Sequence, residues 1–307
     1  MTGARPLSAQ IHPSSFRLHP STPPLTCGYE DAQSPGLMPT ELAIIGAGNM
    51  AEAIARGVLS AGVVRADAVV AADVSETRRA VFADQLKVRT AASNAEAVAG
   101  ARRVLLSVKP QTMKSALEEL SPALPPDALV ISIAAGISAG FIERTLGRAV
   151  SWRVIRTMPN TPMLVGQGMV GLSRGAHATD ADVADARRLF EAAASVVEVP
   201  EDKLHAVTAV SGSGPAYFFF LVEHMVRAGV ELGLTPAQAH ELATKTALGA
   251  AAMLTGSADS PQELRRKVTS PNGTTHAAVV HMEQAGVPLA VVDALKAADR
   301  RRRELGV

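Results

Sequence analysis

The sequence predicts an α/β protein in which a parallel sheet with helices on both faces is followed by an all-α segment. Three observations lead to this prediction. From residue 40 to about 172, short apolar runs alternate with helical patterns, which is typical of a parallel sheet covered by helices. After about residue 200 the strand patterns stop and helical segments follow one another. A glycine-rich turn joins the first apolar run to an alanine-rich helix.

This turn is the most informative local pattern in the chain. The apolar strand Leu42–Ile45 is followed by Gly46, Ala47 and Gly48 and then by the helix. Gly46 permits a tight turn, Gly48 lets the backbone approach a ligand, and the small Ala51 lets the helix pack closely on the strand. The first N–H groups of a helix have no partner within it and bind anions. We therefore expect a pyrophosphate site in a Rossmann-type domain; the alternative is a turn without a ligand.

Apolar runs and turn signals place the other elements. Further strands are expected at Val69–Ala72, Lys87–Thr90, Val104–Val108, Leu129–Ile133, Ser151–Arg156 and Gly168–Leu172. Helices are expected at Glu76–Gln85, Gln111–Leu120, Ala216–Leu232, Thr235–Leu254, Pro261–Val268, Thr275–Ala285 and Leu289–Leu305. The expected N-cap residues are Asn94, Ser138, Thr179 or Asp180, Thr235 and Ser260.

The helices of the second region are apolar on more than one face, and Ala247–Leu254 is almost entirely apolar. A helix that is apolar all round must be buried, which in a segment of this size favours burial against a second subunit. The alternative is a self-contained bundle. We therefore divide the chain into a disordered extension (1–39), a dinucleotide-binding Rossmann domain (40–175) and a helical domain for substrate binding and dimerisation (176–307). The extension is rich in proline and lacks periodicity; a transit peptide, or a natural start at Met38, are the alternatives.

Composition excludes several classes of function. The formal net charge of +1 gives no electrostatic case for a nucleic-acid or membrane-surface partner. Cys27 is the only cysteine, so the chain forms no intramolecular disulfide, and the histidines follow no metal-ligand spacing. No apolar run reaches the roughly 20 residues that span a bilayer. A single cysteine fits a reducing compartment, and we expect a cytoplasmic protein that binds no metal.

Several positions at strand ends are candidate cofactor contacts. Asp73 follows the second strand, where an acid accepts a hydrogen bond from the ribose 2′-hydroxyl of NAD. Arg78 and Arg79 follow closely and suit the 2′-phosphate of NADP, unless they lie on a solvated helix face. Lys109 follows the fourth strand and either contacts a ribose or is an ordinary surface lysine. The segment Ile133–Gly136 ends the fifth strand with small residues, which leave room for a nicotinamide ring or form a plain turn.

Polar loops give candidate substrate contacts. Asn160 lies between two prolines, and its amide is either aimed at a ligand or part of a rigid connector. Residues 211–217 form either one wall of a site or a close helix crossing. In residues 269–275, hydroxyls and free N–H groups converge at the start of a helix, which suits a small carboxylate. The alternative for that turn is a helix cap alone.

Six motifs together resemble the pyrroline-5-carboxylate reductase family over residues 41 to about 306. These are Ile-Gly-Ala-Gly-Asn-Met (45–50), Val-Lys-Pro-Gln (108–111), Ser-Ile-Ala-Ala-Gly-Ile (132–137), Arg-Thr-Met-Pro-Asn-Thr-Pro (156–162), Ala-Val-Ser-Gly-Ser-Gly-Pro-Ala-Tyr (209–217) and Val-Thr-Ser-Pro-Asn-Gly-Thr-Thr (268–275). The resemblance implies a reductase of the last step of proline biosynthesis that uses NADPH, with NADH possible. It also implies a homodimer through the helical domain and possibly a decamer.

The resemblance assigns site residues. Nicotinamide-nucleotide contacts are implied for Ile45, Gly46, Ala47, Gly48, Asn49, Met50, Asn94, Ser107, Val108, Lys109, Pro110, Ile133, Ala134 and Ala135. Substrate contacts are implied for Ser270, Gly273, Thr274 and Thr275, with Thr275 near the ring nitrogen. Asn272 replaces a glycine of the family pattern, and we expect the turn to persist because Asn tolerates left-handed dihedrals. The family's frequent Glu before the 261–268 helix is absent, and nearby Asp259 is given no role.

The implied reaction is the reduction of a cyclic imine, 1-pyrroline-5-carboxylate. Hydride adds to the carbon of the C=N bond, and a protonated nitrogen makes a strong acid unnecessary, so positioning carries the catalysis. Thr275 is the expected hydrogen-bonding partner of that nitrogen. One alternative is a two-domain hydroxy-acid dehydrogenase, which needs a general base for which Lys245 is the candidate. Another is a non-catalytic NAD(P)-sensing protein.

Overall fold

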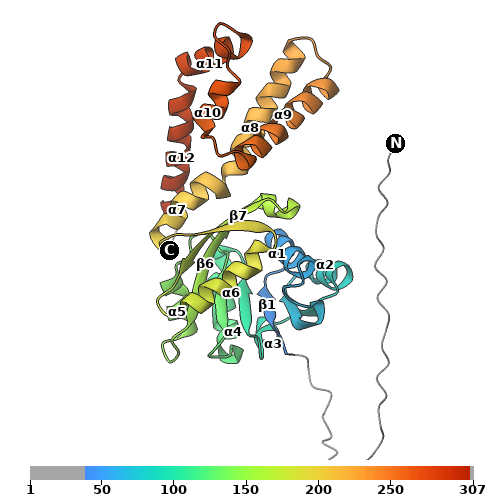
Figure 1. Ribbon diagram of the computed structural model, residues 1–307. Coiled ribbons are helices and arrows are strands. Elements are labelled where there is room, and N and C mark those ends of the chain that lie inside the picture. The colour runs from blue at the N-terminus through green and yellow to red at the C-terminus, as the bar shows by residue number, and fades with distance from the viewer. Residues whose placement is uncertain (1–38, 305–307) are drawn as a thin grey trace, which may run out of the picture. The chain divides into compact units, whose positions relative to one another are not determined.

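The computed structural model describes residues 39–304 (Figure 1). The predicted extension over residues 1–39 lies outside the described residues except for Pro39. The strands are β1 (Leu42–Ile45), β2 (Val69–Ala72), β3 (Arg89–Ala91), β4 (Arg103–Leu106), β5 (Leu129–Ser132), β6 (Arg153–Pro159), β7 (Gly168–Arg174) and β8 (Ala194–Glu198). The helices of this part are α1 (Asn49–Ser60), α2 (Glu76–Leu86), α3 (Asn94–Val98), α4 (Met113–Leu120), α5 (Ala139–Leu146) and α6 (Asp180–Glu191).

The strands form one sheet in the order β3-β2-β1-β4-β5-β6-β7-β8. Neighbouring strands run parallel except β6 and β7, which pair antiparallel. The strand order reverses at β1, with β2 on one side and β4 on the other, and a crevice for ligands is expected at such a point. The structure confirms the predicted sheet followed by helices, and corrects one point: the sheet is mostly parallel, because the predicted strand over residues 168–172 belongs to β7 and runs antiparallel to β6.

Helices cover both faces of the sheet, and the alternation of side chains along β1 shows why. Leu42 and Ile44 pack into the core formed with α1, α2 and α6. Ala43 and Ile45 pack into the opposite core, formed with α3, α4 and α5. Because successive side chains of a strand point to opposite faces, a fully apolar run is required where both faces are buried.

Some local predictions are confirmed and others are corrected. Ser138, Thr179, Thr235 and Ser260 cap their helices as predicted, each accepting a backbone N–H. Asn94 is not a cap but the first residue of α3; Ser93 is the N-cap, and its side chain accepts from the N–H of Glu96. Residues 194–198 form β8, a strand that the sequence did not predict because it lies half-exposed at the sheet edge and lacks an apolar run. The sheet thus continues to Glu198, beyond residue 175; the division into domains stays a prediction.

The remaining helices are α7 (Leu204–Val207), α8 (Gly214–Glu231), α9 (Pro236–Gly256), α10 (Pro261–Lys267), α11 (Thr274–Gln284) and α12 (Val287–Glu304). A π-helical segment, Thr208–Gly212, joins α7 to α8. Figure 1 shows α8 and α9 side by side, and α12 packs against α7 and the π-helical segment. Among the described residues of α8–α12, only Gly214, Ala239, Ala243 and Arg302 are buried.

These helices expose an unusual number of large apolar side chains. Phe218, Phe219 and Phe220 are 60%, 69% and 64% exposed, and Leu248 is 62% exposed. Exposed apolar area of this extent marks an interaction surface. Within residues 39–304, no single helix is long and apolar enough to cross a membrane, although α11 and α12, which meet at a 55° bend, pass a test of length and composition as a pair.

Candidate active site

The carboxyl edge of the parallel strands brings together the residues predicted to contact a dinucleotide. The backbone N–H of Gly46 donates to the carbonyl of Ala72 at 2.8 Å, and that of Ser107 donates to the carbonyl of Ile45 at 2.8 Å. The N–H of Ile133 continues the ladder to Leu106 at 3.1 Å. Segments that are far apart in the sequence therefore meet at one edge, directly beyond the ends of β1, β4 and β5.

Gly46 has a geometric reason to be glycine. Its φ is +93°, a value that side chains disfavour. A Cβ atom at this position would lie 2.9 Å from the carbonyl carbon and oxygen of Ser107, which is closer than van der Waals contact. The turn after β1 is thus packed directly against the backbone after β4.

Gly48 is glycine for a different reason. It is the N-cap of α1, has φ −72°, and offers no side-chain cap to the helix. A Cβ atom added there would meet nothing within 4 Å. A side chain at position 48 would thus point into open space, and no side chain caps the first N–H groups of α1, which is an arrangement that suits a phosphate group.

Asp73 braces the glycine turn. Its Oδ2 accepts a hydrogen bond from the N–H of Ala47 at 2.7 Å, and its Oδ1 accepts from the N–H of Ser75 at 2.8 Å. Sequence reasoning predicted Asp73 as a ribose acceptor and missed the contact with Ala47, which has no signal in the sequence. A carboxylate oxygen has further lone pairs, so the ribose contact stays a prediction.

Arg78 and Arg79 do not lie on a solvated helix face. Arg78 donates from Nε to the carbonyl of Ala47 at 2.6 Å and from Nη2 to Glu52 at 2.8 Å. The hydrogen bond from Arg78 is the main cause that lowers the pKa of Glu52 below its usual range. Arg79 donates from Nη1 to the carbonyl of Asp73 at 2.6 Å. Arg78 thus binds the carbonyl of Ala47, and Asp73 binds its N–H.

The other predicted nucleotide contacts have different surroundings. Lys109 is exposed, whereas Ala134 is buried. Asn94 donates from its side-chain amide to Glu119 at 2.7 Å and from its backbone N–H to the same carboxylate at 2.9 Å. The side chain of Asn94 therefore ties α3 to α4.

Asn160 is buried, and both ends of its side-chain amide bind backbone groups. Its Nδ2 donates to the carbonyl of Ser211 at 3.0 Å, and its Oδ1 accepts from the N–H of Met169 at 2.8 Å. The rigid-connector interpretation of Asn160 fits these contacts. Because Ser211 belongs to the π-helical segment, Asn160 fixes the start of the helical region against the end of β6.

The polar turn before α11 has the backbone that the sequence predicted. Asn272 adopts the left-handed φ of +59°, and the N–H of Gly273 donates to the carbonyl of Ser270 at 3.0 Å. Gly273 is the N-cap of α11, so no side chain caps this helix. Within residues 39–304, the exposed hydroxyls of Ser270, Thr274 and Thr275 have no hydrogen-bond partner. No side chain of this turn therefore caps α11, and a role of the turn in binding a ligand stays a prediction.

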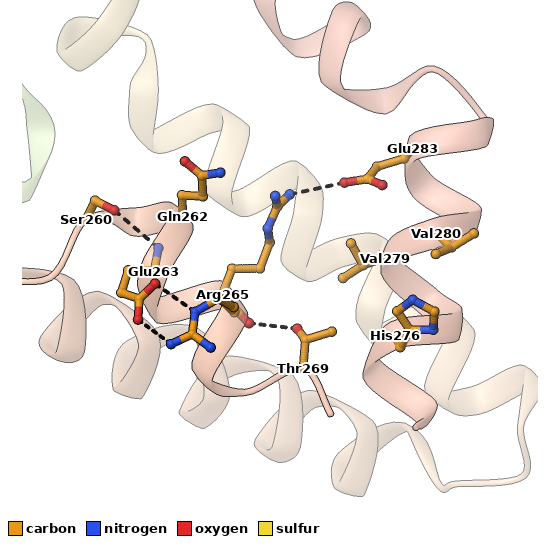
Figure 2. A pocket seen from close by; sticks show the side chains of 10 residues that line it. Ser260, Gln262, Glu263, Arg265, Thr269, His276, Val279, Val280 and Glu283 are labelled. Carbon is orange, nitrogen blue, oxygen red and sulfur yellow. Dashed lines mark hydrogen bonds and ion pairs between the residues drawn. The ribbon is translucent and has the colours of Figure 1, made fainter. Parts of the chain in front are cut away.

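A groove of about 370 Å³ lies next to this turn, between α10 and α11 (Figure 2). Figure 2 shows Arg265 extended toward Glu283, with 3.5 Å between Nη1 and Oε1. Thr269 donates to the carbonyl of Arg265 at 2.6 Å and so fixes the last residue before Ser270. The predicted substrate residues do not line this groove, so it flanks the polar turn rather than forming it.

The polar turn and the glycine turn are not joined within one copy of the chain. Among residues 39–304, no hydrogen bond or ion pair links residues 268–275 to the sheet or to its carboxyl edge. The glycine turn and the polar turn both have the predicted backbone, but no such bond among these residues connects them within one copy.

Comparisons with known proteins agree on one family. Residues 201–305 match the family model "Pyrroline-5-carboxylate reductase dimerisation", and residues 41–136 match "NADP oxidoreductase coenzyme F420-dependent". The pyrroline-5-carboxylate reductase of Pseudomonas aeruginosa is 46% identical over 86% of this chain and 96% of that protein. The chain belongs to the pyrroline-5-carboxylate reductase family.

Solved structures of this family share the fold. The pyrroline-5-carboxylate reductase of Coxiella burnetii has a TM-score of 0.81 and 35% identity, covering 87% of this chain and 99% of that chain. The Plasmodium falciparum pyrroline carboxylate reductase, solved with NADP bound, has a TM-score of 0.77 and 27% identity, covering 89% and 100%. As a member of the pyrroline-5-carboxylate reductase family, the chain is an NAD(P)H-dependent oxidoreductase.

Proposed function

We propose that this protein reduces the C=N bond of 1-pyrroline-5-carboxylate to give L-proline, with NADPH as the preferred electron donor. The observation that carries the proposal is the polar turn before α11. In the segment that matches the dimerisation model of the family, the left-handed Asn272 and the start of α11 lie beside hydroxyls that have no partner within residues 39–304. These N–H and O–H groups can donate hydrogen bonds to a small carboxylate.

The carboxyl edge of the sheet is the proposed nucleotide site. The pyrophosphate would bind the open N–H groups at Gly48 and α1, and the nicotinamide would lie beside Ile133–Ala135. Arg79, which lies along the Asp73–Val74 backbone, supports a preference for the 2′-phosphate of NADPH. When bound, the nucleotide supplies the hydride for the reaction.

The substrate site is the polar turn. Ser270, Gly273 and Thr274 would bind the carboxylate, and the hydroxyl of Thr275 would hydrogen-bond the ring nitrogen. A protonated imine nitrogen makes the neighbouring carbon electrophilic, so the protein has only to orient the ring and exclude water. Such positioning contributes several kcal/mol to the lowering of the barrier.

The active site is proposed to be completed by a second copy of the chain. Within residues 39–304, the polar turn has no hydrogen bond or ion pair to the sheet of its own copy, and α8 and α9 expose Phe218–Phe220 and Leu248. A homodimer through α8–α12 buries this apolar area and lets the turn of one copy face the nucleotide edge of its partner. Further assembly into a decamer, and a cytoplasmic location, belong to the same proposal.

A spectrophotometric assay tests the proposed function. NADPH and NADH oxidation would be followed at 340 nm with the imine as substrate, in parallel with NAD(P)+ reduction by hydroxy acids. We expect consumption of NADPH with the imine and no reaction with hydroxy acids. NADPH binding without consumption would instead identify a sensing protein, and turnover of hydroxy acids would identify the dehydrogenase class.

A further inference from the structure

The loop beside the proposed nicotinamide site is fixed at both ends, and the far end is fixed by a residue of the segment that matches the dimerisation model. Glu201 accepts, at Oε1, a hydrogen bond of 2.7 Å from the backbone N–H of Ala139. Ala139 is the first residue of α5 and ends the loop that begins after β5. Glu201 is the first residue of the segment that matches the dimerisation model.

The near end of this loop is fixed by Ser132. The Oγ of Ser132 accepts from the N–H of Ala134 at 3.2 Å, and the carbonyl of Ser132 accepts from the hydroxyl of Thr157 at 3.1 Å. Between the two ends, Gly136 adopts φ +88°. The loop is thus held by hydrogen bonds at both ends.

Arg156 contacts the residues that fix both ends of the loop. It pairs with Ser132 in the register of β5 and β6, and its Nη1 donates to the same Oε1 of Glu201 at 2.8 Å. The side chain of Arg156 is 8% exposed and that of Glu201 is 36% exposed. Hydrogen bonds to a charged acceptor in such partly desolvated places are among the stronger ones in proteins.

The position of Glu201 in the chain links the loop to the dimerisation segment. The chain runs from Glu201 through α7 and the π-helical segment into α8. A displacement of these helices therefore moves the carboxylate that holds the N–H of Ala139. Hydride transfer depends steeply on the distance and angle between donor and acceptor, so small shifts of the loop beside the nicotinamide change the rate.

We propose that Glu201 is a positioning residue, which fixes the 133–138 loop and ties its geometry to the dimerisation segment. This inference rests on the proposed function in one respect, namely that Ile133–Ala135 line the nicotinamide. Glu201 itself touches neither substrate nor cofactor in the proposal.

The first experiment compares Glu201→Ala, Glu201→Gln and the control Glu198→Ala in the full-length protein. Glu198 is also 36% exposed and also pairs with an arginine, Arg174, at 2.8 Å, but among residues 39–304 it has no bond to the loop. We expect Glu201→Ala to lower kcat at least about tenfold while KM for the imine changes less than about twofold. Glu201→Gln retains an acceptor for the N–H of Ala139 and should recover most of the rate, and Glu198→Ala should match the wild type.

Hydrogen exchange followed by mass spectrometry supplies the second readout, and it needs no substrate. Peptides covering residues 133–141 should exchange faster in Glu201→Ala than in Glu198→Ala or Glu201→Gln. If Glu201→Ala leaves Arg156 unpaired and the protein fails to fold, Arg156→Met is compared with Arg156→Met/Glu201→Ala. These two variants differ only in the hydrogen bond from Ala139 to Glu201, and neither contains the buried charge of Arg156.

The inference requires both a slower kcat and faster exchange in the variant that lacks the acceptor. Unchanged exchange, an unchanged rate, or a loss in Glu201→Gln as large as in Glu201→Ala would overturn it. A wild-type protein that does not reduce the imine would overturn the proposed function instead. In that case the exchange measurement still decides whether Glu201 fixes the loop.

Discussion

The carboxylate of Asp73 accepts a hydrogen bond from the backbone N–H of Ala47, with 2.7 Å between Oδ2 and N. The second oxygen binds the N–H of Ser75. An acid at the end of the second strand is usually interpreted as a contact to the ribose and as a determinant of NAD against NADP. In this protein the same side chain also sets the shape of the glycine turn.

We therefore expect Asp73→Ala to weaken the binding of both NADPH and NADH rather than to change the preference between them. Loss of the bond to Ala47 leaves the turn less ordered, and a hydrogen bond with a charged partner contributes about 1.5–3 kcal/mol. Binding of NADPH and of NADH, measured by fluorescence titration, should weaken in parallel. A variant whose NADH affinity falls while NADPH affinity is kept would show that Asp73 acts on the ribose alone.

The two glycines of the turn should respond differently to alanine. Gly46→Ala forces a side chain into φ +93° and against Ser107, so we expect a loss of about 1–3 kcal/mol in the free energy of unfolding. Gly48→Ala meets nothing within 4 Å and has an ordinary φ, so its stability should be unchanged.

The methyl group of Gly48→Ala should nevertheless weaken NADPH binding, because it fills the space in front of the N–H groups of α1. Thermal denaturation and NADPH titration of both variants check this pair. Equal affinity of Gly48→Ala and the wild type would place the pyrophosphate elsewhere.

Thr275→Ala should lower turnover more than cofactor affinity. Its hydroxyl is exposed at the start of α11 and is proposed to bind the ring nitrogen, so kcat should fall about 10- to 100-fold with little change in NADPH binding. Thr275→Ser keeps the hydroxyl and serves as the control. An unchanged rate combined with weaker NADPH binding would refute this role.

Arg302 is expected to reduce stability in the wild type. It is buried on α12, and within residues 39–304 its Nε and Nη1 have no hydrogen-bond partner. Burial, and then the nearby charge of Arg156, lower the pKa of Arg302. Arg302→Met keeps the apolar volume without the unpaired donors, so we expect a gain of about 1–3 kcal/mol in the free energy of unfolding. The exposed Arg301→Met is the control, and a fall in Tm for Arg302→Met would show that the guanidinium has a stabilising partner.

The pair of Arg103 and Asp185 should give the protein an acid-sensitive contribution to stability. Burial by itself raises the pKa of Asp185, but the hydrogen bonds and charge of Arg103 more than offset it, so the pKa lies below its usual range. The carboxylate contacts Arg103 at 2.6 Å, and the side chain of Arg103 is 5% exposed. A carboxyl whose folded pKa is depressed stabilises the fold above the unfolded value of about 4, and this contribution is lost as the pH falls through the folded value.

Asp185→Asn should therefore destabilise the protein by about 2–4 kcal/mol at neutral pH, because Arg103 stays buried with weaker compensation. The difference from the wild type should narrow below about pH 4. Asp67→Asn, which removes an exposed pair with Arg65, should have little effect at any pH. Urea unfolding as a function of pH measures both variants, and a difference for Asp185→Asn that is independent of pH would contradict the assignment.

The sequence predicted each local element of the nucleotide edge but not the contacts between elements. Gly46 and Gly48 were both interpreted as parts of a phosphate site, and the structure places the turn as expected. The approach of Gly46 to Ser107 appears only when β1 pairs with β4. The edge strand β8 was not predicted, because this half-exposed strand has neither a continuous apolar run nor a regular alternation of apolar and polar residues.

The helix-start signals at Ser138, Thr179, Thr235 and Ser260, and the left-handed turn at Asn272, were determined by the sequence alone. Such features depend on residues within a few positions of one another, so they are encoded where they occur. Only the tertiary structure decided that Asp73 binds Ala47, that Glu201 binds Ala139 and that Asn160 binds Ser211. These partners are 26, 62 and 51 residues apart, and they meet because strand pairing and helix packing bring distant backbone groups to one edge of the sheet.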